Sequence, residues 1–378
     1  MNFIDNIEIK NFKSIRHQKI EGCKRINIFI GYPNVGKSNI LEALSNFSIN
    51  SDSDLFTDFV RVGKSTTLFF NGNVDEAAEV ILNNYYRVKL AYQKHGLSGS
   101  FQLDRFGKGF SEIDKEIQEA NIISKSDSED KIFGLGRFDV NESSFAIGNF
   151  TGDNSLRIYE ETVPDIAMIT KYKKIPVLKY EFKKDVQYES KDAWKLKNPY
   201  GQNIFEIIST KPELNNEVIN LFKEYNLNFV YDSGSQEYKI LKIIDNKIFT
   251  VPFFMSADTL RRLIFHKAAI LSNKNSVLLF EEPEAHMFPP YISKFTGDMV
   301  YNENNNQFFI TTHSPFVLND LMDNVEQGDL AIYVVSYKKE TGETVVHKMS
   351  DTDKNEAYQF GYDFFMNINQ FIPQEAHG

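Results

Sequence analysis

The stretch that most constrains the fold of this chain is FIGYPNVGKSNILEAL, residues 29–44. Its centre, Gly31 to Ser38, satisfies G-x-x-x-x-G-K-[S/T], the pattern of a loop that wraps nucleotide phosphates. RINIFI before it alternates as a strand does, whereas KSNILEALSNF after it carries apolar residues at helical spacing. A strand, a glycine loop and a helix in this order predict an α/β core with a phosphate site at the start of the helix.

The residue types in this loop suit the binding of phosphate. The backbone amides of residues 34–38 point inward at the start of a helix, whose positive end attracts anions. Lys37 would reach the β- and γ-phosphate oxygens, and the Ser38 hydroxyl would bind Mg²⁺. The predicted nucleotide site is lined by Gly31, Asn34, Val35, Gly36, Lys37 and Ser38.

The motif PNVGKS also occurs in the phosphate loop of many small GTPases, so the choice between GTP and ATP depends on the rest of the sequence. A GTPase needs D-x-x-G to sense the γ-phosphate and N-K-x-D to read guanine. The weak matches DRFG (104–107) and SKSD (124–127) begin only 20 positions apart. A strand–helix–strand crossover takes ~30 residues or more, so this spacing argues against a GTPase.

A pair of carboxylates lies far downstream, where SVLLFEEPEAH (276–286) runs from an apolar strand into Glu281 and Glu282. Phosphoryl transfer to water needs an anion to hold the Mg²⁺ shell and a base to orient the attacking water. We predict that Glu281 serves the metal and that Glu282 faces the water. The alternative is an acidic helix start, favoured by the helix dipole. It would account for Glu284, but not for four apolar residues running straight into the pair.

A second strand, QFFITTHSP (307–315), ends in His313. A histidine in that place would hydrogen-bond the γ-phosphate and hold the attacking water. A lone histidine is more often a structural residue, but this one is the third member of an ordered set. The predicted catalytic residues are Glu282, His313 and Lys37, and the predicted Mg²⁺ ligands are Ser38 and Glu281.

Net charge and cysteine content exclude several classes of protein. The 378 residues include 42 Lys and Arg and 52 Asp and Glu. This negative balance argues against a protein whose whole surface binds nucleic acid, because phosphate binding depends on Lys and Arg. The single cysteine, Cys23, excludes a disulfide framework, and no apolar run approaches the ~20 residues of a membrane helix. We expect a soluble cytoplasmic protein that does not use a membrane. DNA binding stays open through a local basic patch, more often a solvated face, whose best candidates are Lys183, Lys184, Lys191, Lys195 and Lys197.

Taken together, these motifs resemble the ABC-type head ATPases of the RecF/SMC group, in particular the stand-alone OLD-like ATPases of bacteria. IEIKNFKSI resembles the opening of that group, and the phosphate loop matches its G-x-x-N-x-G-K-S-N-x-L-E-A-L, with Asn34 and Asn39 as typical members. EEPEAHMFP and TTHSP resemble its carboxylate and switch-histidine strands. The resemblance implies an α/β P-loop NTPase fold of ABC-ATPase head type, with a mixed sheet, an antiparallel lobe and an inserted α/β lobe. It makes ATP and Mg²⁺ the expected ligands.

The resemblance is firm at both ends of the chain and loose between residues 50 and 195. We predict an N-terminal head segment over 1–75, an inserted lobe over 76–245 and a C-terminal head segment over 246–378. Within the loose region TTLFFNGN, YYRVKLAY and GSFQLDRFG look like strands of an antiparallel region. SEIDKEIQEANII (111–123) looks helical.

The resemblance also implies a homodimer that sandwiches two ATP molecules. In that group the serine of a signature segment contacts the γ-phosphate of ATP bound to the opposite subunit, and here the matching residue in SADTLRRL is Ser256. Two positions depart from the pattern: Glu281 replaces an aspartate, and Asp258 replaces a flexible glycine. Both departures favour an alternative in which the chain is a sensor or scaffold that binds ATP with negligible hydrolysis.

Longer OLD-like relatives carry a Toprim nuclease domain, which needs ~100 residues of its own. Only 48 residues follow Leu330, and the D-x-D of SDTDKNEA suits a solvated turn and helix cap. A direct nuclease is therefore disfavoured. The sequence predicts an ATP-hydrolysing switch that acts through a separately encoded effector protein, in phage defence or DNA maintenance.

Overall fold

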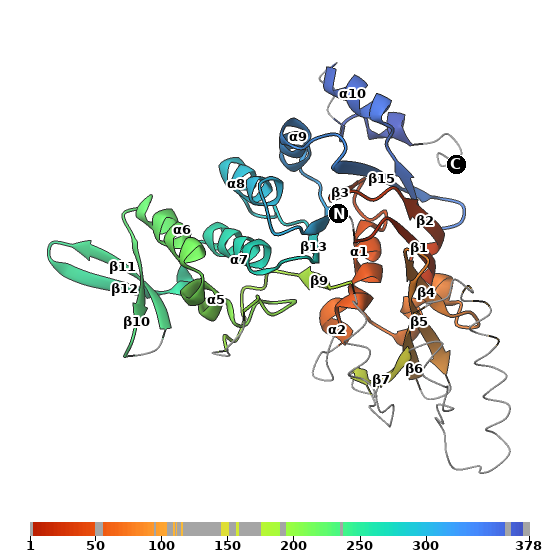
Figure 1. Cartoon of the computed structure of the whole chain (residues 1–378), viewed down its shortest axis with the longest axis horizontal. Coiled ribbons are helices and arrows are strands. Elements are labelled where there is room, and N and C mark those ends of the chain that lie inside the picture. The colour runs from red at the N-terminus through yellow and green to blue at the C-terminus, as the bar shows by residue number, and fades with distance from the viewer. Residues whose placement is uncertain are drawn as a thin grey trace, which may run out of the picture.

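The computed structural model has a central sheet of six strands in the order β16-β15-β3-β14-β13-β9 (Figure 1). It describes residues 3–49, 56–93, 96–103, 145–150, 156–158, 175–189, 194–234, 237–359 and 364–372, with the isolated positions 109, 111 and 115. Five of the six strands are parallel, and β16 pairs antiparallel with β15. The strands are β3 Ile26–Ile30, β9 Val177–Tyr180, β13 Val277–Glu281, β14 Gln307–Thr311, β15 Leu330–Lys338 and β16 Glu343–Lys348.

Both faces of the central sheet are buried. On β13, Leu278 and Phe280 belong to one hydrophobic cluster, whereas Val277 and Leu279 belong to the other. Successive side chains of a strand point to opposite faces, so a strand covered on both sides needs an unbroken apolar run. This requirement explains the apolar segments SVLLF and QFFI in the sequence.

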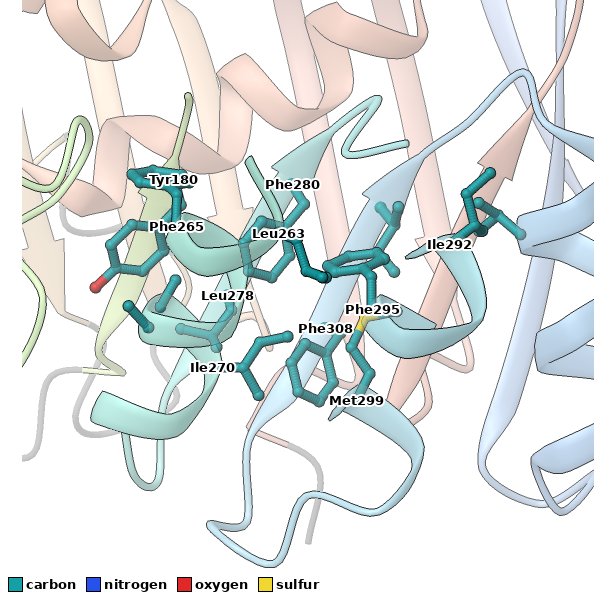
Figure 2. Close-up of a cluster of buried hydrophobic side chains, with 14 of the residues drawn as sticks. Tyr180, Leu263, Phe265, Ile270, Leu278, Phe280, Ile292, Phe295, Met299 and Phe308 are labelled. Atoms are coloured by element: carbon teal, nitrogen blue, oxygen red, sulfur yellow. The ribbon is translucent and has the colours of Figure 1, made fainter. Parts of the chain in front are cut away.

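Helices cover one face of the central sheet. Leu263 of α7 and Phe295 of α8 pack in the same cluster as Phe280 and Phe308 of the strands (Figure 2). A proline stands in the first turn of both α8 and α9, where its fixed φ suits a helix start. The helices of this part are α7 Asp258–Ser272, α8 Pro289–Val300, α9 Pro315–Asn324 and α10 Asp351–Gln359, with the short η5 Ile368–Phe371 near the C-terminus.

The other face carries α1, which lies between the central sheet and a second, antiparallel sheet (Figure 1). Ile40 and Leu44 of α1 share a buried cluster with Ile7 of β1 and Leu279 of β13. The second sheet has the order β2-β1-β4-β5-β6-β7-β8. Its strands are β1 Asn6–Phe12, β2 Ile15–Glu21, β4 Ala78–Leu82, β5 Tyr86–Gln93, β6 Gly96–Leu103, β7 Phe145–Phe150 and β8 Leu156–Ile158. The helices beside it are α1 Lys37–Ser45, η1 Asn46–Ser48, α2 Phe56–Phe59, η2 Ser65–Leu68 and η3 Phe70–Gly72.

A smaller lobe combines two helices with a three-stranded antiparallel meander. Phe222 of α6 stacks on Phe229 of β10, with ring centroids 5.4 Å apart. The β11–β12 hairpin extends away from the helices and exposes Ile243, Ile248 and Phe249 (Figure 1). The elements are α5 Ile204–Thr210, α6 Pro212–Lys223, β10 Asn228–Asp232, β11 Glu237–Ile244, β12 Lys247–Pro252 and η4 Phe253–Met255.

The predicted fold class is confirmed: an α/β P-loop fold with a mixed sheet, an antiparallel lobe and an α/β lobe. The predicted strand at TTLFFNGN (66–73) is wrong, because this segment forms the 3₁₀ helices η2 and η3. Three consecutive residues, 68–70, are buried there, and Asn71 has a left-handed φ of 52°, which a strand does not accommodate.

The boundaries of the three predicted segments stay a prediction. Within 76–245, β4 pairs with β1 and β9 pairs with β13, so this segment contributes strands to both large sheets. The weak GTPase motifs at 104–107 and 124–127 and most of the predicted helix 111–123 lie outside the described residues. No helix in the described ranges is long and apolar enough to cross a membrane.

Candidate functional site

Three strands of the central sheet end at one edge, and each delivers part of the candidate site. β14 lies between β3 and β13, with Thr311 opposite both Phe29 and Glu281. The Glu282 amide donates to the Thr311 carbonyl (3.0 Å), and the Thr312 amide donates to the Phe29 carbonyl (3.2 Å). The loop after β3, the carboxylates after β13 and His313 after β14 therefore meet at this edge.

The phosphate loop has the backbone that its glycines predict. Gly36 is the N-cap of α1 with a φ of 97°, and Asn34 has a φ of 63°. A Cβ at Gly31 would stand 2.3 Å from the Val335 carbonyl oxygen, and one at Gly36 would stand 2.0 Å from Thr344 Oγ1. Both glycines are therefore required by the space around them, and Gly36 also by its backbone conformation.

Lys37 curls back over its own loop. Its ammonium donates to the carbonyl oxygens of Gly31 (3.1 Å) and Tyr32 (2.8 Å), and only 4% of the residue is exposed. Burial lowers the pKa of Lys37 to about 8, against the opposing charges of Glu282 and Glu281. A buried cation that donates to two neutral carbonyls is well placed to accept an anionic partner.

Two hydroxyls from distant segments hold the loop in shape, and sequence reasoning missed both roles. Asn39 Nδ2 donates to Ser14 Oγ (2.6 Å), which lies 2.6 Å from Thr344 Oγ1. Thr344 in turn donates to the Val35 carbonyl oxygen (2.8 Å). Since the Thr344 proton is used on Val35, Ser14 must donate to Thr344, and the chain of bonds runs in one direction. We call Ser14 and Thr344 the loop brace.

Glu281 forms an ion pair that the sequence did not predict. Arg61 Nη2 donates to Glu281 Oε1 (3.2 Å), and Arg61 also bonds to Glu42 of α1. Glu42 is fully buried and is paired in addition with Lys13. The carboxylate predicted to serve Mg²⁺ is therefore tied through Arg61 to the helix that follows the phosphate loop.

Glu282 and His313 face each other. Glu282 Oε1 lies 3.3 Å from His313 Nε2, and both side chains are partly exposed. Glu282 has a φ of 42°, a left-handed backbone that costs free energy in a residue with a side chain. Burial and the charge of Lys37 lower the pKa of His313, while Glu282 opposes them, which favours a neutral imidazole at neutral pH.

Glu284 connects the carboxylate segment to the histidine strand. Its Oε1 accepts from the Thr312 hydroxyl (2.6 Å) and from the His313 amide (3.1 Å). The side chain is largely buried, and burial raises its pKa. The interpretation of Glu284 as part of a helix start is wrong, because the next helix, α8, begins only at Pro289.

Ser256 lies at the end of the small lobe, directly before α7. Its hydroxyl donates to the Phe253 carbonyl within the same turn (2.7 Å), and within the described residues no hydrogen bond links it to the phosphate loop. Asp258 forms ion pairs with Arg261 and Arg262 at the start of α7. Burial would raise the pKa of Asp258, but the hydrogen bond and charge of Arg262 lower it overall.

Oxygen donors suit Mg²⁺, which proteins bind through one or two carboxylates together with substrate phosphates. The half-buried Ser38 hydroxyl and Glu281 carboxylate fit this donor set. Ser38 lies at the start of α1 and Glu281 at the end of β13, and their role as Mg²⁺ ligands stays a prediction.

The predicted basic patch is mostly engaged within the chain. Lys184 pairs with Asp258 (3.7 Å), and Lys197 pairs with Glu189 (3.4 Å). Lys183 lies over the Tyr200 ring at 3.5 Å from its centroid. Lys195 lies near the Trp194 ring, and Lys191 is outside the described residues. The described lysines do not form a free basic stripe.

Comparison with known proteins finds a family model that matches part of the chain and several partial relatives. Residues 170–319 match the family model described as "AAA domain, putative AbiEii toxin, Type IV TA system". The chain is 51% identical over 41 residues to an "ATP/GTP phosphatase" of Helicobacter pylori, covering 11% of each protein. It is 30% identical over 96 residues to "DNA replication and repair protein RecF" of a Thermoanaerobacter species, covering 25% of each. It is 41% identical over 66 residues to an uncharacterized Methanocaldococcus jannaschii protein, covering 18% of this chain and 29% of that relative.

The chain therefore spans less than a third of each of these relatives. Among solved structures, an SMC head bound to the C-terminal winged-helix domain of ScpA is similar at a TM-score of 0.46 and 12% identity, covering 94% of this chain and 100% of that one. The SMC head domain of Thermotoga maritima is similar at a TM-score of 0.41 and 12% identity, covering 92% and 99%. The family model and the RecF match support the resemblance to ABC-type head ATPases of the RecF/SMC group.

Proposed function

We propose that this chain is an Mg²⁺-dependent ATPase whose heads dimerise on ATP and act as a switch for a partner protein. One observation carries the proposal: the phosphate loop, the carboxylate pair and His313 meet at one edge of the central sheet although they lie up to 282 residues apart (31 to 313). The match to an ATP/GTP phosphatase is in accord with this chemistry.

Each group has a role in hydrolysis. Lys37 and the loop amides bind the β- and γ-phosphates, while Ser38 and Glu281 hold Mg²⁺, which neutralises phosphate charge when bound. Glu282 accepts the proton of the attacking water, whose oxygen forms a bond to the γ-phosphorus as the β–γ bridge breaks. ADP and phosphate are the products. His313, neutral and 3.3 Å from Glu282, orients that water.

The second subunit completes the site through Ser256. This serine stands at the start of α7 beside the exposed side chains of Phe254 and Met255, in a position open to another molecule. ATP would favour the closed dimer because it contacts both subunits in that state only. Lys184, Arg261 and Arg262 fix Asp258 at the helix start, so the charged replacement of a glycine does not point freely toward a phosphate.

The biological role is a second part of the proposal. We place the chain with the OLD-like stand-alone ATPases and propose that it controls a separately encoded effector in phage defence or DNA maintenance. The description of the matching family model, which names a toxin and a toxin–antitoxin system, supports this placement.

The competing function is an ATP-binding sensor with negligible hydrolysis. The ion pair between Arg61 and Glu281 favours it, because a carboxylate engaged by arginine is a weaker metal ligand. In that case ATP closes the dimer and a partner reads the closed state without turnover.

Comparing wild type with Glu282→Gln separates the two functions. Loss of a general base lowers kcat by roughly 10²–10⁴-fold, whereas ATP binding should persist. Glu326→Gln, at an exposed carboxylate on the α9–β15 connection, is the matched control. Equal inactivity of wild type and Glu282→Gln, with and without DNA, would leave only the sensor.

Gel filtration with ATP tests the dimer. Glu282→Gln should trap ATP and shift to twice the monomer mass at micromolar protein, while Lys37→Ala should not shift. A mutant that stays monomeric at saturating ATP would contradict the sandwich.

A further inference from the structure

His266 of α7 is a polar residue surrounded by aromatic side chains. Only 3% of it is exposed. Its ring meets Phe280 of β13 edge-on at 5.4 Å between centroids and lies 5.3 Å from Phe295 of α8. Phe280 and Phe295, both labelled in Figure 2, meet edge-on in this part of the core, with ring centroids 5.8 Å apart. An apolar side chain of similar size would pack at this place without a polar atom to satisfy.

Neither ring nitrogen of His266 has a hydrogen-bond partner among the described residues. Burial, with a smaller effect of Arg262, lowers the pKa of His266 to about 3, so the imidazole is neutral and keeps one N–H donor. A buried polar group without a partner costs free energy and is rare in native proteins, so this one needs a reason.

The backbone of Pro283 acts on the ring as a hydrogen-bond acceptor, which opposes the lowering of the His266 pKa. Neither ring nitrogen completes a hydrogen bond to it in this structure. Pro283 directly follows Glu282, whose φ of 42° makes that turn a strained segment. The helix that carries His266 starts two residues after Ser256. His266 thus stands between the segment proposed to meet the second subunit and the turn that carries the general base.

We propose that His266 is a positioning residue whose ring N–H donates to the Pro283 carbonyl when ATP closes the dimer, so that movement of α7 sets the orientation of Glu282. The inference rests on the proposed function. It explains why a histidine occupies an aromatic site suited to phenylalanine. The ring N–H has a hydrogen-bond acceptor in the closed state and lacks one in the open state.

His266→Phe and His266→Gln separate positioning from packing. His266→Phe should keep or raise the Tm, bind ATP within about twofold of wild type and lower kcat about tenfold with little change in KM. His266→Gln, which restores an N–H donor, should recover most of the kcat. Phe295→Leu weakens the packing around His266 but keeps the imidazole, so it should lower the Tm and leave kcat near wild type.

Hydrogen exchange gives a readout that does not need turnover. ATP should protect the amides of residues 282 and 284–286 in wild type and His266→Gln, but about tenfold less in His266→Phe. Equal protection in all three overturns the inference, and so does a lower Tm for His266→Phe, which would make the histidine a packing residue. If wild type fails to hydrolyse ATP while this protection pattern holds, the proposed hydrolysis fails and the coupling stands.

Discussion

The phosphate loop and the Ser256 segment differ in how much of their surroundings one chain provides. The loop is closed in from several sides: Lys37 is buried on two carbonyls, and Ser14 and Thr344 bond around the loop. Among the residues that the structure describes, Ser256 bonds only within its own turn, and its neighbours Phe254 and Met255 are 59% and 65% exposed. One region is pre-organised for its ligand, while the other exposes apolar side chains of the kind that protein contacts cover. The difference is the one that the proposed dimer requires, in which the second subunit would complete the site.

Replacing Lys37 should have the largest effect, because it removes the charge in the pre-organised half. We expect Lys37→Ala to weaken ATP binding by about 100-fold or more, since a charge-assisted bond in a buried place is lost. Isothermal titration calorimetry measures this, with the exposed Lys339→Ala as the matched control. An affinity within about threefold of wild type would show that the loop does not hold phosphate through Lys37.

Replacing Glu284 should separate alignment from binding. Glu284→Ala leaves the Thr312 hydroxyl and the His313 amide without their acceptor, which costs about 1–3 kcal/mol of folding free energy. We expect a lower Tm and about a tenfold lower kcat, with ATP affinity nearly unchanged. Glu284→Gln keeps an acceptor oxygen and should retain most activity. Similar loss in both variants would assign Glu284 a role that depends on its charge.

Removing the loop brace should give a smaller effect. Thr344→Val deletes the hydroxyl between Ser14 and Val35, worth about 1 kcal/mol, so ATP affinity should fall about fivefold. Thr344→Ser retains the hydroxyl and should bind like wild type. Indistinguishable titrations for Val and Ser would mean that the loop keeps its shape without the brace.

Ser256→Ala should have the smallest effect on a single subunit and should act only between subunits. Tm and ATP affinity at low protein concentration should match wild type, whereas the ATP-dependent dimer of Glu282→Gln should weaken about threefold. Sedimentation in that background, with exposed Ser233→Ala as control, measures it. Weaker ATP binding at monomer concentrations would instead place Ser256 in its own chain's site.

The sequence allowed the parts of the site on strand ends to be predicted. The change from strand to helix period around the glycine loop located Lys37, and apolar runs ending in polar residues located Glu281, Glu282 and His313. These signals are local, because each depends on a few neighbouring residues.

The supporting residues could not be predicted, because their partners are distant in sequence. Thr344 and Ser14 are 330 positions apart, and Arg61 and Glu281 are 220 apart. Nothing near Arg61 in the chain distinguishes it from any exposed arginine. The misassigned strand at TTLFFNGN has a related cause, since its apolar residues are all buried together rather than on one face.

The loop brace has a consequence for how the protein is made. Val35 and Thr344, joined by a hydrogen bond, are separated by 309 positions. Translation adds ~5–20 residues per second, so the ribosome completes the phosphate loop roughly 15–60 s before it adds the threonine that holds it. A growing chain therefore carries an unbraced loop until Thr344 has been made. The braced loop, with an affinity for ATP about fivefold higher by the prediction above, is available only after Thr344 has been added.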